Sequence, residues 1–316
     1  MSYNITEYSP RFKNQVAALR SRIFGGSEAF SVGYFEWKYE QNPYIGEPLF
    51  CVALLDGNVV GMVGAYGTEW RAGRSGNSHI IPCGGELGVD QEHQRHGLGR
   101  GLIDYLWDDA RKKGYKYAMH LGSGPSSLRL KTGLQFDCLA TYKSFQRNSI
   151  RMLIARGCRK LNSLLGYRLG VPFHNFDAWV ERSSGSVYGA LAPRLAEMSE
   201  LVSHCCSKSA TRHVRDARFY RWRFADPRSV YRFIFCEQGG SMAGFLVLHQ
   251  FPSGGWTTVV DWEASTHAAW CQLLEAAMES KVHNLRITAP AFSEEQTQAL
   301  LRMGFASARE GRAAVG

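Results

Sequence analysis

Hydrophobic residues recur at a helical interval in the stretch that follows position 97. The positions that share this three- or four-residue spacing are Leu98, Leu102, Ile103, Leu106 and Ala110. They predict an amphipathic helix, which the basic residues 111–113 and then Gly114 bring to an end. Residues 85–89 instead alternate and predict a strand. The predicted strand and helix are joined through the hexapeptide Gln94-Arg95-His96-Gly97-Leu98-Gly99.

Neighbouring segments extend this pattern on both sides. Before the hexapeptide, residues 51–55 and 59–65 flank Asp56-Gly57, a dipeptide that favours a tight hairpin turn. After it, residues 115–121 predict a buried strand, and Gly124-Pro125 predicts the start of a short helix that ends near Gly133. The mixture of strands and helices indicates the α/β fold class.

A glycine-containing turn between a strand and a helix is a candidate site for a phosphate group. The first N–H groups of a helix have no acceptor within the helix, and a glycine lets an anion approach the backbone because it has no Cβ. Two well-known phosphate loops are excluded, since Leu102 stands where the dinucleotide fingerprint needs glycine and Gly-Lys-Ser/Thr occurs nowhere. An ordinary glycine-rich turn before a helix is the alternative interpretation.

The pattern that remains, Gln-x-x-Gly-x-Gly after a strand, resembles the acyl-CoA pyrophosphate loop of the GCN5-related N-acetyltransferase (GNAT) superfamily. Lys131-Thr132-Gly133-Leu134 is similar to the Lys-x-Gly-Phe ending of a later helix in that superfamily. The resemblance spans about residues 1–147. It implies a mostly antiparallel central sheet with one splayed parallel strand pair, flanked by helices. It also implies acetyl-CoA as co-substrate, no metal, and N-acetyltransferase activity.

The resemblance further implies how the coenzyme is bound. Backbone N–H groups from Arg95 to Arg100 would bind the pyrophosphate, Gln94 would shape the turn, and a backbone N–H near Leu87 to Val89 would polarise the thioester carbonyl. The implied coenzyme-binding residues are Leu87, Val89, Gln94, Arg95, His96, Gly97, Leu98, Gly99, Arg100 and Lys131. Arg100 and Lys131 are equally compatible with solvated surface charges.

Glu86 is the candidate general base. The two-residue period of a strand places Glu86 on the face opposite Leu87 and Val89, and the resemblance implies a direct or water-relayed base on this strand. A partly buried glutamate with a raised pKa suits that role. The alternative is a structural acid that is bonded to neighbouring backbone.

The acid that protonates the departing thiolate is where the sequence departs from the superfamily. Many relatives use a tyrosine at the position that Arg129 occupies here. His120 and Tyr142 are the candidate substitutes, and a core histidine is the alternative for His120.

Composition adds limits on domain number, chemistry and location. The chain has 316 residues with 45% hydrophobic content, enough for two globular domains. A net charge of +9 suits a polyanionic coenzyme, and no nucleic-acid motif accompanies it. Eight cysteines without a Cys-x-x-Cys pair favour reduced thiols, no metal site and a cytoplasmic protein. No apolar run approaches a membrane span, and the first residues do not resemble a signal peptide.

The second half of the sequence repeats the first. The paired segments, in chain order, are 10–12 with 193–195, 34–43 with 219–227, 57–64 with 240–246 and 130–133 with 301–304. Four matches in one order indicate duplication. Residues 263–268 stand where the second glycine loop would be and contain no glycine, so the second copy is predicted to be degenerate and to bind no CoA.

The predicted organisation is a catalytic domain (1–147), a basic amphipathic connector (148–185) and a degenerate GNAT-like domain (186–316). Residues 148–170 could contact an anionic membrane surface, but packing on a domain is the favoured interpretation. The predicted function is transfer of an acetyl group to a primary amine of a small molecule such as an amino sugar or envelope precursor, without nucleic acid, in a chain that could form a homodimer. The alternatives are an aminoacyl or peptidyl transferase of the same fold and a non-catalytic CoA-binding regulatory protein.

Overall fold

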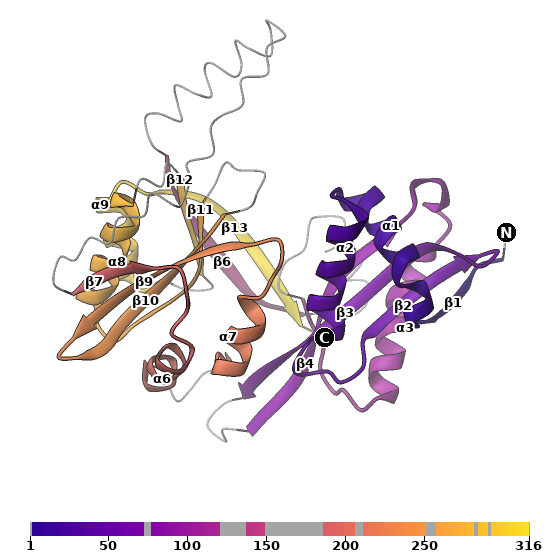
Figure 1. Ribbon diagram of the computed structural model, residues 1–316, viewed down its shortest axis with the longest axis horizontal. Helices are drawn as coiled ribbons and strands as arrows, with labels where there is room; N and C mark the ends of the chain where they lie inside the picture. Colours follow the sequence, from indigo (N-terminus) through magenta and orange to yellow (C-terminus); the bar gives the residue numbers. More distant parts are fainter. Residues whose placement is uncertain are drawn as a thin grey trace, which may run out of the picture. The chain divides into compact units, whose positions relative to one another are not determined.

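The computed structural model of the protein describes residues 2–72, 77–120, 137–148, 186–205, 211–250, 257–280, 284–289 and 292–315. Side chains are described within these ranges except at 29, 30, 72, 137–142, 148 and 308–315. The chain forms two compact units (Figure 1). The first unit comprises Met1–Ala140, Ser207–Pro227 and Arg312–Gly316, and the second comprises Thr141–Cys206 and Arg228–Gly311.

The first unit is built around a sheet of five sequential strands. Its elements are β1 (Asn4–Glu7), a 3₁₀ turn (Pro10–Phe12), α1 (Lys13–Phe24), α2 (Glu28–Phe35), the π-helix η2 (Glu36–Glu40), β2 (Leu49–Leu55), β3 (Asn58–Ala72), β4 (Asn77–Val89), a 3₁₀ turn (Gln91–His93), α3 (Leu98–Lys112), β5 (Met119–His120), β8 (Arg212–His213) and α7 (Ala217–Arg223). Neighbouring strands β1 to β4 pair antiparallel, and β4 pairs with β5 in parallel. This confirms the predicted antiparallel sheet with one parallel pair.

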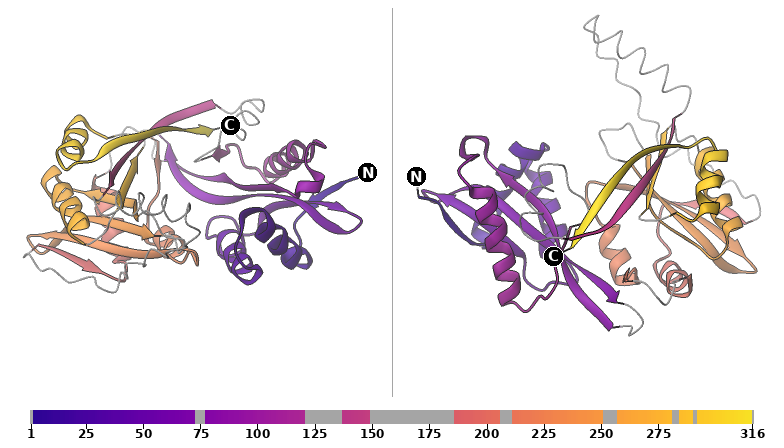
Figure 2. Two further views of the ribbon diagram at one scale, coloured as in Figure 1. Left: turned by 90° about the horizontal axis from the view of Figure 1, so that it is seen from above. Right: turned by 180° about the vertical axis from the view of Figure 1, so that it is seen from behind.

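The sheet is covered on both faces because β2 alternates its side chains between two cores. Cys51 and Ala53 pack with Leu102 and Leu106 of α3, whereas Val52 packs with the hydrophobic face of α1. In the left panel of Figure 2 the strands of this unit run between α3 on one side and the indigo helices α1 and α2 on the other. Side chains on the two faces of strand β4 therefore meet different helices.

Several predicted elements are confirmed. The Asp56-Gly57 hairpin joins β2 to β3, and both turn residues have positive φ, 50° and 79°. The helix after the hexapeptide is α3, which ends just before Gly114. The strand predicted over 115–121 is shorter in the described part of the chain, since β5 covers Met119–His120. The helix predicted from Gly124 lies outside the described residues.

The aromatic segments that the repeat pairs with each other are brought together in the first unit. The indole N–H of Trp37 donates to the carbonyl of Trp222 (2.7 Å), and the indole N–H of Trp222 donates to the carbonyl of Trp37 (2.8 Å). The two rings stack with 5.1 Å between their centroids. Equivalent residues that make reciprocal contacts are typical of a local two-fold relation.

The second unit repeats the order of elements seen in the first. Its elements are β6 (Asp137–Asn148), β7 (Val187–Ala190), α6 (Leu195–Cys205), β9 (Val230–Gln238), β10 (Ser241–Gln250), β11 (Thr257–Ala264), α8 (His267–Glu279), β12 (Asn284–Ala289), α9 (Glu294–Arg302) and β13 (Ala306–Val315). The antiparallel hairpin β9–β10 is followed by β11, α8 and the parallel strand β12, as β2–β3 is followed by β4, α3 and β5.

One pair of glycines supports the duplication residue by residue. A Cβ on Gly61 would lie 3.0 Å from Cδ1 of Leu102 in α3, and a Cβ on Gly244 would lie 2.8 Å from Cδ1 of Leu273 in α8. In both units, therefore, a strand glycine makes room for a leucine of the following helix.

The compact units do not follow the predicted domain boundaries, which rest on the repeat in the sequence. The segment Ser207–Pro227, with β8 and α7, belongs to the first unit, where β8 pairs with β3. Strand β6 pairs with β12 in the second unit, and the end of β13 pairs with β5 in the first. The predicted connector lies outside the described residues beyond position 148.

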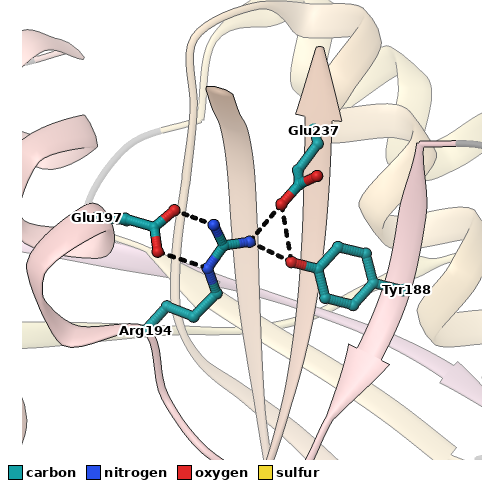
Figure 3. Close-up of polar contacts among 4 residues, drawn as sticks. All are labelled: Tyr188, Arg194, Glu197 and Glu237. Atoms are coloured by element: carbon teal, nitrogen blue, oxygen red, sulfur yellow. Dashed lines mark hydrogen bonds and ion pairs between the residues drawn. The ribbon is translucent and has the colours of Figure 1, made fainter. Parts of the chain in front are cut away.

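Arg194 links three elements of the second unit (Figure 3). Its guanidinium binds Glu197 of α6, Glu237 of β9 and the hydroxyl of Tyr188 on β7. Arg194 and Tyr188 together lower the pKa of Glu237. All the acceptors around this arginine are supplied by the second unit itself, so we assign a structural role to the cluster.

None of the helices in the described ranges has the length and apolar character needed to cross a bilayer.

Candidate functional site

The start of α3 has the geometry of an anion site. The N-cap residue Gly97 has φ +78°, and Arg95, two residues earlier, has φ +67°. Residues in the left-handed region turn successive N–H groups toward one side and form anion-binding turns. No side chain caps this helix.

Five consecutive backbone donors are available here. In the described part of the chain, nothing accepts from the N–H groups of residues 95–99, whereas the N–H of Arg100 donates to the carbonyl of Gly97 (3.0 Å). The available donors are the first five of the six predicted positions. They lie at the positive end of the dipole of α3, which favours an anion.

The side chains around the loop have distinct roles. The amide of Gln94 donates to the carbonyl of Val89 (3.0 Å), which ties the loop to the end of β4. Among the described residues a Cβ on Gly99 would meet only Leu87, at 4.0 Å, so packing within this part of the chain does not require glycine there. Arg100 forms an exposed ion pair with Asp104 (2.8 Å). Lys131 lies outside the described residues.

Strand β4 carries a bulge a short way before the loop. Leu87 pairs with Val63 and Gly84 pairs with Ala65, so two residues of β4, Gly85 and Glu86, face one residue of β3. A bulge of this kind re-aims the backbone and the side chains next to it. On its other side β4 pairs with β5 only at Cys83, within the described ranges.

Glu86 faces α1, on the side of the sheet away from α3, while Leu87 and Val89 pack on the α3 side as predicted. The guanidinium of Arg20 donates to both carboxylate oxygens of Glu86, at 3.1 and 3.0 Å. The side chain of Arg20 is 6% exposed and that of Glu86 17%. A charge-assisted bidentate pair engages both carboxylate oxygens and fixes their orientation. This geometry favours a structural role for Glu86, with Arg20 rather than neighbouring backbone as its partner.

His120 lies on the opposite face of β4. Its ring covers Gly84, and it meets the ring of Trp107 of α3 edge-on at 5.7 Å. The structure therefore separates His120 from Glu86 by the thickness of the sheet. The side chain of Tyr142 and the whole of Arg129 lie outside the described residues, so the assignment of the acid stays a prediction.

Two charged residues of the site were missed by the sequence analysis. Arg20 stands 66 positions before its partner Glu86, and Lys38 lies buried beside Gly85. In the sequence, the run 34–39 stands out as part of the repeated segment 34–43. The π-helix that contains Lys38 (Glu36–Glu40) is a feature frequent at functional sites, and it becomes visible only in the structure.

The corresponding helix of the second unit is closed by its own side chain. The hydroxyl of Thr266, the N-cap of α8, accepts from the N–H of Ala269 (3.1 Å). No residue with positive φ precedes α8 in the described part of this connection. The two helix starts thus differ in the donors they offer to a ligand. No group of three or more His, Cys, Asp or Glu could hold a metal ion in the described ranges.

Comparison with known proteins agrees with this geometry. Residues 17–130 match the model of the acetyltransferase (GNAT) family. This segment is therefore similar to the GNAT family. No curated protein matches the sequence. The matched segment contains β4, the hexapeptide and α3, so the similarity to the GNAT family covers the candidate site.

Solved structures extend the GNAT-like fold to the whole chain. A tandem GNAT protein from the clavulanic acid biosynthesis pathway is 13% identical, with a TM-score of 0.59, over 100% of this chain and 98% of that one. A probable N-acyltransferase from Enterococcus faecalis V583 is 9% identical (TM-score 0.69; 100% and 72%). N-myristoyltransferase from Saccharomyces cerevisiae, with bound myristoyl-CoA, is 12% identical (TM-score 0.65; 99% and 78%). At these identities the likeness concerns the fold, which is a tandem GNAT-like fold.

Proposed function

We propose that this protein is an acyl-CoA-dependent N-acyltransferase that moves an acetyl group from acetyl-CoA to a primary amine of a small molecule. The observation that carries the proposal is the uncapped start of α3, whose five backbone donors have no acceptor in the described part of the chain. The GNAT family match and the acyl-CoA in one structural neighbour support acyl transfer.

The coenzyme would bind with its pyrophosphate at residues 95–99. The part of the coenzyme that links the pyrophosphate to the thioester would run from there toward the bulge of β4. A backbone N–H near Leu87 to Val89 would polarise the thioester carbonyl. The amine nitrogen attacks the carbonyl carbon, so that a C–N bond forms, the C–S bond breaks and the sulfur leaves with the electron pair. The proton lost by the nitrogen is taken up by the thiolate or by solvent.

The acceptor class and the setting of the reaction are also part of the proposal. An amino sugar or another envelope-precursor amine, met in the cytoplasm, remains our hypothesis for the acceptor. The second unit would bind no CoA because the hydroxyl of Thr266 caps the start of α8 by accepting from the N–H of Ala269. Titration of the full chain with acetyl-CoA by calorimetry should therefore give one site per chain, and two sites would contradict this part.

Substitution of Gly99 by valine tests the coenzyme site. A Cβ at this position would meet Leu87 at 4.0 Å, an ordinary contact, and valine is no worse than glycine in a helix, so folding should be retained. The branched side chain would stand between the pyrophosphate and the backbone N–H groups of the loop. We therefore expect the affinity for acetyl-CoA to fall at least about tenfold. Gly46→Val is the matched control, because nothing lies within 4 Å of a Cβ at Gly46. Unchanged affinity in Gly99→Val would refute the site.

A CoA-binding regulatory protein is the second candidate, favoured by the ion pair that engages the proposed base, Glu86. Release of free thiol from acetyl-CoA across a panel of amines separates the two. Release with any amine supports the enzyme, whereas binding without release supports the regulator. An aminoacyl or peptidyl transferase would not need the open start of α3.

A further inference from the structure

Lys38 is a buried cation in an aromatic surround. The residue is 8% exposed. Its Nζ lies 5.2 Å from the ring centroid of Tyr34 and 5.3 Å from those of Tyr39 and Tyr66. Burial acts to lower the pKa of Lys38, but the hydroxyl oxygens of Tyr39 and Tyr34 and the carboxylate of Glu86 outweigh it, and the pKa lies above its ordinary value. Ring faces at this distance stabilise the charged form, so Lys38 is an ammonium ion at neutral pH.

This cation lies directly against the bulge of β4. A Cβ on Gly85 would be 3.1 Å from Nζ of Lys38 and 2.6 Å from the hydroxyl of Tyr39, so a glycine is needed for this close approach. The hydroxyl of Tyr39 also accepts from the N–H of Glu86 (3.4 Å). Lys38 therefore stands on the face of β4 that Glu86 occupies.

The charges around the bulge do not cancel. The ionisable groups near Lys38 are Tyr34 of α2, Tyr39 of η2, Tyr66 and Glu86 of the sheet, with Arg20 of α1 behind Glu86 and with Cys83 and Arg223 beside Tyr66. Burial raises the pKa of Tyr39 and Tyr66, which stay neutral. Arg20 neutralises Glu86, and Arg223 lies 4.0 Å from Asp226.

The two carboxylates of the π-helix that contains Lys38 are engaged elsewhere. Glu36 and Glu40, which share the π-helix with Lys38, both bind Lys13. Among the described residues, the positive charge of Lys38 thus has no carboxylate of its own beside Gly85 and Glu86.

We infer that Lys38 makes this site selective for weakly basic amines, such as an α-amino group or an aromatic amine, and unfavourable for strongly basic alkylamines and polyamines. The inference rests on the proposed function and names its acceptor class. A fixed cation next to the bulge repels an ammonium ion and favours the neutral amine. An α-amino group has a pKa of about 8, whereas an alkylammonium of the lysine type has one of about 10.4, so the former loses its proton more readily.

The same cation favours the reaction itself. The neutral nitrogen attacks the thioester carbon, negative charge develops on the carbonyl oxygen, and the C–S bond then breaks to give the thiolate. Lys38 stabilises that developing charge electrostatically. The proton lost by the nitrogen ends on the thiolate or in solvent, which removes the need for a free carboxylate base.

Acceptor preference of the unmodified protein is the first test. Thiol release from acetyl-CoA is measured at about pH 7.5 with glycinamide, an α-amino compound, and with propylamine, which has a similar size. We expect kcat/KM for glycinamide to exceed that for propylamine at least about tenfold. A preference for propylamine or for a polyamine would overturn the inference while leaving acyl transfer intact. No release with any amine would overturn the proposed function and this inference together.

Variants of Lys38 then test the cause of the preference. In Lys38→Met, the acidic limb of the pH profile of kcat with propylamine should move up by about one pH unit or more, while Lys38→Arg should stay close to the unmodified profile. Lys112→Met, at the exposed end of α3, is the control for loss of a lysine. Acetyl-CoA affinity, measured in parallel, should be unchanged in Lys38→Met. An unmoved limb in a variant that binds acetyl-CoA normally would overturn the role of Lys38.

Discussion

His213 of β8 should make the stability of the first unit depend on pH. Its ring contacts those of Trp70, with 5.2 Å between centroids, and Phe219, at 4.4 Å. Its Nε2 is buried and has no hydrogen-bond partner in the described part of the chain. Burial, with the neighbouring Arg215 and Arg223, lowers the pKa of His213 from 6.5 to about 3.

The sign and size of the effect follow from this pKa. Because the folded-state pKa is depressed, the unfolded chain binds more protons below pH 6.5, and folding stability is lost as the pH falls from there toward 3. At about pH 7.5 the contribution is nearly zero. At about pH 5, keeping the ring neutral costs about 2 kcal/mol of folding free energy, because the charged form of the histidine exceeds the neutral form about thirtyfold in the unfolded chain.

Urea unfolding followed by tryptophan fluorescence measures this difference. The unfolding free energy is determined at both pH values for the unmodified protein and for His213→Phe, which keeps a ring in contact with Trp70 and Phe219 but cannot titrate. The unmodified protein should lose about 2 kcal/mol more than the variant on acidification, and the carboxylates common to both cancel in the comparison. Equal losses in the two proteins would show that the ring of His213 is not held neutral by burial.

Three further predictions concern other contacts. Arg20→Met should destabilise the first unit by about 3 kcal/mol in urea unfolding because it leaves Glu86 buried without its partner, and the double variant with Glu86→Gln should recover most of that loss; a double variant as unstable as the single one would contradict this. Trp222→Phe should cost about 1–3 kcal/mol, since the carbonyl of Trp37 loses its buried donor, and a cost within experimental error would argue that water replaces the indole. Thr266→Ala should cost about 1 kcal/mol in the second unit through loss of the cap of α8, without changing acetyl-CoA affinity in calorimetry; altered affinity would mean that the second unit takes part in binding.

The local part of the site could be predicted from sequence because its signals are local. The alternation before position 90, the glycines of the hexapeptide and the spacing from Leu98 to Ala110 together specify a strand, a loop and a helix within about 25 residues. The face of Glu86 was also predictable, because it needs only the period of a strand.

Long-range features of the site were not predictable in this way. The sequence near Glu86 does not indicate that the guanidinium of Arg20 binds it, and the run 34–39 does not indicate that Lys38 approaches Gly85. Both contacts are set by how α1 and η2 pack on the sheet, which depends on tertiary structure. The pairing of β6 in the second unit and of the end of β13 in the first likewise arises from contacts between distant segments.

The unlike starts of α3 and α8 have a consequence for how the two halves respond to metabolite supply. A fold that leaves its first helical turn to be completed by a small molecule gains stability with the concentration of that molecule, and a fold that completes the turn with its own hydroxyl does not. Heating the protein at rising acetyl-CoA concentration should therefore move one melting transition upward and leave the other in place. In a cell, the first unit would resist proteolysis more strongly as the concentration of the coenzyme rises, while the resistance of the second unit would stay constant.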